Sequence, residues 1–93
     1  MFVHLSVHYP RPEHEPDLIA SMHRFAAALS GAPGLLSAAT LSDERSRRLV
    51  GLTTWSTRAA WEAAVGRARE VVEHDDFDLW EERGPEVLVL DEV

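Results

Sequence analysis

Three polar residues able to do acid–base chemistry alternate along the first apolar segment of the chain. His4, Ser6 and His8 occupy every second position of Phe2–Tyr9, a segment rich in residues that favour strands. Successive side chains of a strand point to opposite faces, so these three share one face. An imidazole exchanges protons near neutral pH. The pattern predicts a proton acceptor, His8 or His4, with Ser6 beside a bound substrate.

This polar stripe has two interpretations that the sequence leaves open. If it faces the helices, its burial is costly unless it lines a cavity that holds water or a ligand. If the segment is an edge strand, its polar side is partly hydrated and needs no function.

A fourth candidate, His74, lies beside Asp75 and Asp76. It could line the substrate site as a base at its entrance, ligate a haem, or simply end a helix, where a cation suits the dipole. The run from His74 to Asp78 lacks the ligand spacing of zinc or calcium sites, so no metal is expected.

The aromatic residues offer a second kind of site. Trp55, Trp61 and Trp80, together with Phe25 and Phe77, could wall a flat aromatic ligand. Aromatic residues at these spacings also commonly fill a core, so the two alternatives stand side by side.

Composition excludes several classes of function. A chain of 93 residues has room for one domain, residues 1–93. Its formal charge of −7 disfavours nucleic acid as a partner, because phosphate backbones are repelled. The absence of cysteine, of a signal-peptide pattern and of a membrane-spanning apolar run predicts a cytoplasmic protein without membrane contact.

The elements that must position these residues follow from periodicity and from turn residues. The sequence predicts a strand at Phe2–Tyr9, a helix at Glu13–Leu29, strands at Leu35–Leu41 and Arg48–Trp55, a helix capped by Ser56 or Thr57, and a strand at Val87–Leu90. The acidic segment Glu73–Pro85 is expected to be irregular, with its apolar residues folded back onto the core.

The order strand, helix, strand, strand, helix, strand is that of a ferredoxin-like α+β fold. Such a fold has a four-stranded antiparallel sheet with both helices on one face. Here the later strands are apolar on both sides, as in Val87–Leu90. The uncovered face is therefore expected to pack against a second copy, which predicts a homodimer through the sheet.

Two stretches resemble the antibiotic biosynthesis monooxygenase family. They are Pro33–Ser37, similar to the family's PGF-like entry to the second strand, and Leu49–Trp61, an apolar strand ending in Trp followed by the opening of a helix. Ser56 replaces the glutamate usual at that opening. The resemblance implies a dimeric α/β barrel. Several members oxidise anthrone- or quinol-type aromatic compounds with O₂, using neither metal nor flavin.

Site residues of the family map unevenly onto this chain. The quinol-oxidising type uses a Trp, an aromatic residue and an Asn, which correspond to Trp55, Trp61 and Gly51, so the Asn is missing. The haem-degrading type has its Trp at about Ala64 and its axial His near His74, and its first-strand Asn falls near Ser6.

The function expected from the resemblance is a monooxygenase without cofactor. Its substrate would be a planar aromatic or phenolic molecule walled by Trp55, Trp61 and Trp80. The alternatives are a non-catalytic dimeric binding module, which Gly51 favours, and a haem-degrading relative.

Overall fold

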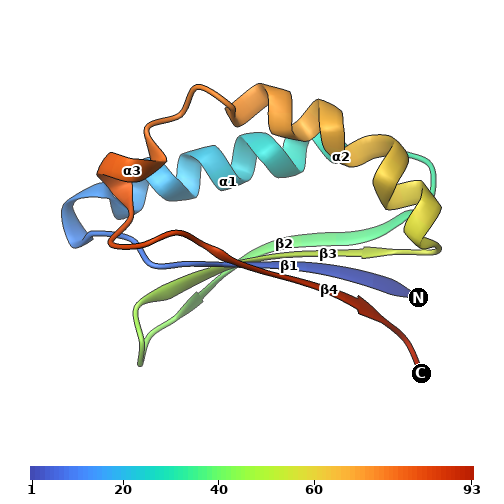
Figure 1. Cartoon of the computed structure of the whole chain (residues 1–93), viewed down its shortest axis with the longest axis horizontal. Coiled ribbons are helices and arrows are strands. Elements are labelled where there is room, and N and C mark those ends of the chain that lie inside the picture. Colours follow the sequence, from blue (N-terminus) through green and yellow to red (C-terminus); the bar gives the residue numbers. More distant parts are fainter.

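A four-stranded antiparallel sheet carries both long helices on one of its faces (Figure 1). The computed structural model describes residues 1–93. Its elements are β1 (Phe2–His8), η1 (Pro12–His14), α1 (Glu15–Leu29), β2 (Leu35–Asp43), β3 (Arg48–Trp55), α2 (Arg58–Val72), α3 (Phe77–Trp80) and β4 (Glu86–Asp91). The strand order is β2-β3-β1-β4, which confirms the ferredoxin-like fold. None of the helices is long and apolar enough to cross a membrane.

The element boundaries differ from the prediction where local hydrogen bonds decide them. Pro12–His14 forms a separate 3₁₀ turn before α1. β2 extends to Asp43, whose carboxylate accepts hydrogen bonds from Ser46 Oγ and Arg48 Nη2 across the hairpin turn. These bonds lower the pKa of Asp43 to about 2. Thr57 is the residue that caps α2, because its Oγ1 accepts from the backbone N–H of Ala60.

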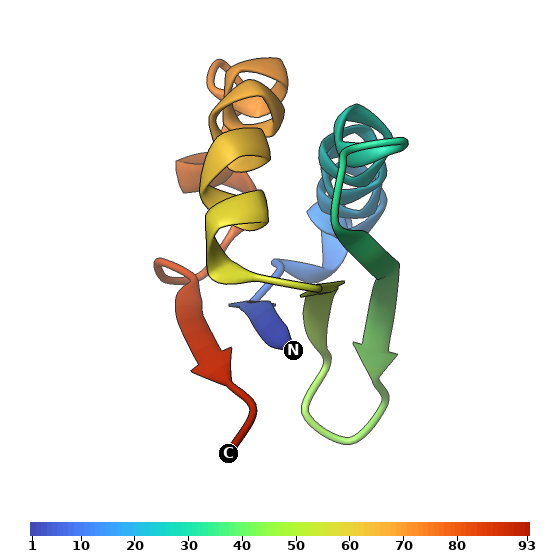
Figure 2. The ribbon, with the colours of Figure 1, turned by 90° about the vertical axis from the view of Figure 1, so that its right-hand side faces the viewer.

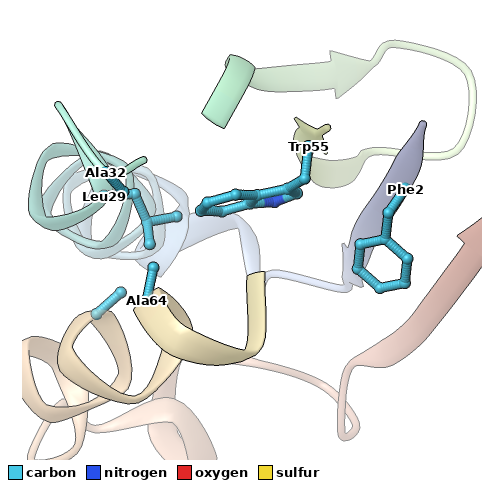
Figure 3. Packing of buried hydrophobic residues seen from close by; sticks show 6 residues of the cluster. Phe2, Leu29, Ala32, Trp55 and Ala64 are labelled. Carbon is cyan, nitrogen blue, oxygen red and sulfur yellow. The ribbon is translucent and has the colours of Figure 1, made fainter. Parts of the chain in front are cut away.

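The main core lies where the end of α1 meets the start of α2. Figure 3 shows the Trp55 indole reaching from β3 toward Leu29 and Ala64 on the two helices. Trp55 and Leu29 are fully buried, and Trp55 Nε1 donates to Thr53 Oγ1 at 2.9 Å. Phe2 and Ala32 complete this end of the core.

A second, smaller core lies toward the other end of the sheet. It contains Leu18, Met22 and Leu49, with Phe77 and Trp80 of α3 packed against it. The segment containing α3 is fastened to the end of β1 by the backbone bonds Arg11 N–H to Trp80 O and Glu82 N–H to Tyr9 O. Phe77 and Trp80 fold back onto the core, as expected, and they do so within a short helix, whereas Leu79 was also expected to fold back but is 51% exposed.

The face of the sheet opposite the helices is uncovered in the single chain (Figure 2). It presents Leu41, Leu88 and Leu90, each between 40% and 47% exposed. Leu88 pairs with Leu5 and Leu90 with Val3 on the neighbouring central strand. A continuous apolar surface therefore crosses the sheet on this side.

Two glycines with positive φ make a matched stability test. Gly34 has φ +85°, and a Cβ there would lie 2.6 Å from Ala60 Cβ, whereas Gly31, with φ +78°, has open space around it. Gly34→Ala is expected to lower the free energy of unfolding by about 2–4 kcal/mol, and Gly31→Ala by only about 1 kcal/mol. Urea denaturation followed by circular dichroism measures both. Equal losses would mean that the contact with α2 at Gly34 contributes nothing.

Candidate functional site

The polar stripe of β1 lines a cavity of about 260 Å³ between the sheet and the helices. β1 lies between β3 and β4, so the edge-strand alternative is wrong. The apolar wall comes from both long helices, α3 and the strands. Its larger members are Met22, Phe25, Leu52, Val72, Phe77 and Val87. The charged and titratable side chains on the lining are His4, His8 and Arg69, and no carboxylate lines the cavity.

One end of the stripe is a hydrogen-bonded chain of three side chains. His8 Nδ1 lies 2.9 Å from Glu81 Oε1, and His8 Nε2 lies 3.1 Å from Ser6 Oγ. The Glu81 side chain is only 3% exposed and that of His8 12%. A carboxylate can only accept, so we assign the ring hydrogen to Nδ1. Nε2 then accepts from the Ser6 hydroxyl, which itself borders the cavity.

Glu81 reaches His8 because α3 turns the chain back across the end of β1. The backbone N–H of Glu81 donates to Phe77 O, and Glu81 forms an isolated antiparallel bridge with Pro10. Sequence reasoning did not single out Glu81. It stands in an acidic stretch, and no spacing relates it to a histidine 73 positions away.

His4 occupies the other end of the stripe and is held differently. Its side chain is buried, its ring lies 5.3 Å from that of Trp61, and it makes no hydrogen bond within the protein. Burial, and then the nearby Arg69 guanidinium, lower the pKa of His4 below its usual value. The ring is therefore neutral at pH 7, with two nitrogen atoms free to meet a ligand.

The three tryptophans and His74 lie outside the cavity lining. Trp55 is fully buried in the main core, Trp61 packs behind His4, and Trp80 packs edge-on against Phe77. The side chain of His74 is 93% exposed and pairs only with the adjacent Glu73. The structure thus forms the aromatic wall from phenylalanines rather than tryptophans. Trp61 Nε1 is buried without a hydrogen-bond partner.

Gly51, which the family resemblance aligns with an Asn, faces Ser6 across the β1–β3 pair. A Cβ at Gly51 would lie 2.7 Å from Ser6 Oγ and 3.4 Å from Met22 Cε. The space that a side chain would need is taken by the Ser6 hydroxyl, so the two residues fit as a pair. No three His, Asp or Glu side chains converge in this structure to hold a metal ion.

The lowered pKa of His4 predicts how stability depends on pH. Between its folded value and about 6.5, the unfolded chain binds more protons at this residue than the folded protein does. The free energy of unfolding should therefore fall as pH drops below about 6.5. The contribution of His4 should become constant below the pKa that His4 has in the folded protein. Replacing His4 by Gln should remove that part of the slope, whereas replacing the exposed His23 by Gln serves as the control. Urea denaturation midpoints between pH 5 and pH 8 measure it. An unchanged slope in the His4 variant would contradict the assignment.

Comparison with solved structures shows which proteins share this fold. No protein-family model matches the sequence, and no curated protein is significantly similar to it in sequence. Rv0793 from Mycobacterium tuberculosis is similar in structure with a TM-score of 0.84 and 17% identity, over 99% of this chain and 94% of the other. A proposed antibiotic biosynthesis monooxygenase from Deinococcus radiodurans gives 0.77 and 14%, over 100% and 93%.

A third similar structure contains a bound tetrapyrrole. It is a variant of MhuD with two manganese protoporphyrin IX molecules bound per active site, and its TM-score is 0.76 at 19% identity, over 100% of this chain and 95% of the other. At these identities the comparisons establish that this chain has the ferredoxin-like fold of structures named as antibiotic biosynthesis monooxygenases.

Proposed function

We propose that this chain is a monooxygenase that oxidises a small planar phenolic molecule with O₂, using no cofactor. The observation that carries the proposal is the chain Ser6–His8–Glu81 at the edge of an otherwise mainly apolar cavity. Activation of O₂ without a cofactor begins by making an electron-rich anion of the substrate, and a positioned base is what that step requires. The shared fold with named monooxygenases supports the assignment.

The proton moves along the three side chains in a defined order. Ser6 Oγ accepts the proton of the substrate while its own hydroxyl proton passes to His8 Nε2, 3.1 Å away. Glu81 lies at Nδ1, where its carboxylate stabilises the imidazolium that forms and fixes the ring orientation. The substrate carbanion then adds to O₂, and the imidazolium returns its proton to the peroxide.

Loss of water from the hydroperoxide completes the reaction. For an anthrone-type substrate, a CH₂ group and O₂ become a C=O group and water, so atoms and electrons balance. The four-electron reduction of O₂ is supplied entirely by the substrate carbon.

The size of the cavity limits the substrate. Its volume of about 260 Å³ lies just below the roughly 300–1,000 Å³ usual for small-molecule sites. The phenylalanine and aliphatic walls suit flat rings, and the serine, threonine and histidine side chains of the lining offer polar atoms to orient them. Compounds of two or three fused rings fit this description better than a porphyrin does.

Oxygen uptake is the direct test of the proposal. An anthrone and a naphthohydroquinone, each supplied to purified protein in metal-chelated buffer, should consume O₂ in proportion to the protein present. Heat-denatured protein gives the control for autoxidation. No uptake above that control with either compound would count against an oxygenase acting on such substrates.

A homodimer through the uncovered face of the sheet is part of the proposal. Its support is the apolar surface formed by Leu41, Leu88, Leu90 and their neighbours, which a second copy would cover. Leu88→Glu should convert a dimer into a monomer, because a charge would be buried in the contact. Leu79→Glu on α3, where the leucine is 51% exposed against 40% for Leu88, should leave the dimer intact. Light scattering after size-exclusion chromatography measures the mass. A monomeric wild type would contradict the prediction.

A binding module without turnover is the second candidate function. Gly51 favours it, because no side-chain amide stands where the quinol-oxidising type has one to meet a substrate oxyanion. Ligand binding without O₂ uptake would identify it. The haem-degrading alternative is weakened by the position of His74, which is 93% exposed and outside the cavity lining. We expect no Soret band to develop when hemin is mixed with the protein.

A further inference from the structure

The two histidines of the cavity differ in what they have left to bind. Both nitrogens of His8 are occupied by Glu81 and Ser6. His4 is 92% buried, being 8% exposed, borders the same cavity, and has no hydrogen-bond partner. The His4 nitrogens are not fully buried, so they are accessible from the cavity, and a ligand atom bound there can hydrogen-bond to them.

Arg69 adds a positive charge at the same place. It borders the cavity from α2 and forms no ion pair, although four other arginines of the chain do. His4 and Arg69 border the same cavity from β1 and α2, so both side chains can reach a ligand bound in it. In a chain of charge −7, this cavity contains one guanidinium and no carboxylate.

Packing holds His4 in position. The centroid of its ring lies 5.3 Å from that of Trp61, and the Trp61 centroid lies 5.1 Å from that of the Phe2 ring. A neutral imidazole and a guanidinium both donate hydrogen bonds, and donors beside a positive charge select an anionic oxygen. The adjoining walls, which include Phe25 and Val72, are apolar and suit an aromatic ring attached to that oxygen.

We propose that Arg69 and His4 form an anion subsite, and that the ligand of this cavity is a planar aromatic compound bearing an acidic oxygen. The oxygen belongs either to a carboxylate or to a phenolate, and both present the same charge to the subsite. The proposal deepens the proposed function, since it concerns the same cavity, but binding requires no turnover. It also divides the roles of the histidines: His8 accepts the proton through Ser6, and His4 holds the opposite, charged part of the ligand.

Four naphthalenes substituted at the same position test the subsite by isothermal titration calorimetry. They are 2-naphthoate, 2-naphthol, 2-naphthylmethanol and 2-naphthylmethylammonium. 2-Naphthoate should bind at least tenfold more tightly than the neutral 2-naphthylmethanol, a difference of about 1.4 kcal/mol in binding free energy. 2-Naphthylmethylammonium should not bind. Proton release on binding of naphthol, read from enthalpies in two buffers, distinguishes a bound phenolate from a bound phenol.

Two arginines one half-turn apart on α2 provide matched variants. Arg69→Gln should abolish the preference for the carboxylate while leaving affinity for the neutral compound unchanged. Arg67→Gln, which changes the net charge equally outside this cavity, should retain the preference. His4→Gln should weaken carboxylate binding as well. Equal affinity of the wild type for anion and neutral compound would overturn the proposal, as would equal effects of the two arginine variants.

Failure of the subsite and failure of the oxygenase proposal are distinguishable. Tight anion binding that depends on Arg69, without O₂ uptake, supports the subsite and counts against turnover. Uptake of O₂ that is indifferent to Arg69→Gln, together with no anion preference in calorimetry, overturns the subsite alone.

Discussion

Replacing His8 by Ala should lower kcat/KM for oxygen uptake by roughly 10²–10⁴-fold, the usual contribution of a positioned acid–base group. The reason is geometric. His8 Nε2 is the group next to the Ser6 hydroxyl that borders the cavity, and no other base is hydrogen-bonded to that hydroxyl. The affinity for 2-naphthoate should change little, because the anion is expected at Arg69 and His4. A loss confined to turnover therefore separates the role of a base from general damage to the cavity.

Glu81→Gln should produce a smaller but clear loss, on the order of 10²-fold, by acting through His8. A carboxylate fixes the hydrogen on Nδ1, whereas the amide of Gln can donate to Nδ1 and leave the hydrogen on Nε2, which then cannot accept from Ser6. Glu81→Asp should recover part of the rate, because a carboxylate remains that can accept from His8 Nδ1. His23→Ala, which removes an exposed imidazole from α1, is the control. Full turnover in the His8 variant would show that the proton leaves by another route.

The sequence was sufficient for the fold and for one face of the site because both depend on local patterns. Alternation places His4, Ser6 and His8 on one face whatever their partners are, and the predicted third strand, Arg48–Trp55, has the observed bounds. The side of the sheet to which that face turns follows from Phe2 and Trp55, which are opposite one another and both fully buried.

Glu81 and Arg69 could not be predicted in the same way, because their roles depend on tertiary contacts. The approach of Glu81 to β1 rests on backbone bonds between Arg11 and Trp80 and between Tyr9 and Glu82, in a segment with no periodic signal. Arg69 resembles any other surface residue of α2 until the cavity is seen beside it. The positions of Glu81 beside His8 and of Arg69 beside the cavity arise from tertiary folding, and the spacing of residues in the sequence does not predict them.

The tryptophans illustrate how position along a strand decides between core and cavity. Trp55, Thr53 and Gly51 point to one face of the sheet. Trp55 pairs with Phe2 of β1, which shares its face with the polar stripe, so Trp55 and the stripe lie on the same side. At its end of the sheet α1 and α2 converge and fill the space, as Figure 3 shows around Leu29 and Ala64. Nearer Gly51 the interior leaves the cavity open. Strand parity predicts the face, and only the helix positions determine whether that face is filled.

The largest effect on stability is therefore expected at Trp55 rather than at a residue of the cavity. Trp55→Ala removes a fully buried indole and should lower the free energy of unfolding by about 3–5 kcal/mol. Domains of this size are stable by only about 5–15 kcal/mol, so the variant should melt at least roughly 12 °C below the wild type. Thermal unfolding followed by far-ultraviolet circular dichroism measures the difference. Trp80→Ala, at a half-buried position beside Phe77, should cost clearly less.

Trp55→Phe separates a core role from a substrate-binding role at the same position. It retains most of the buried area and loses the hydrogen bond from Nε1 to Thr53 Oγ1, so a cost of about 1 kcal/mol is expected. Because the indole does not border the cavity, the KM for an anthrone and the affinity for 2-naphthoate should match those of the wild type. A substrate-binding indole would instead give a change of KM with little change of stability. That result would require a conformation in which α1 and α2 separate over the end of the sheet and expose Trp55 to the substrate.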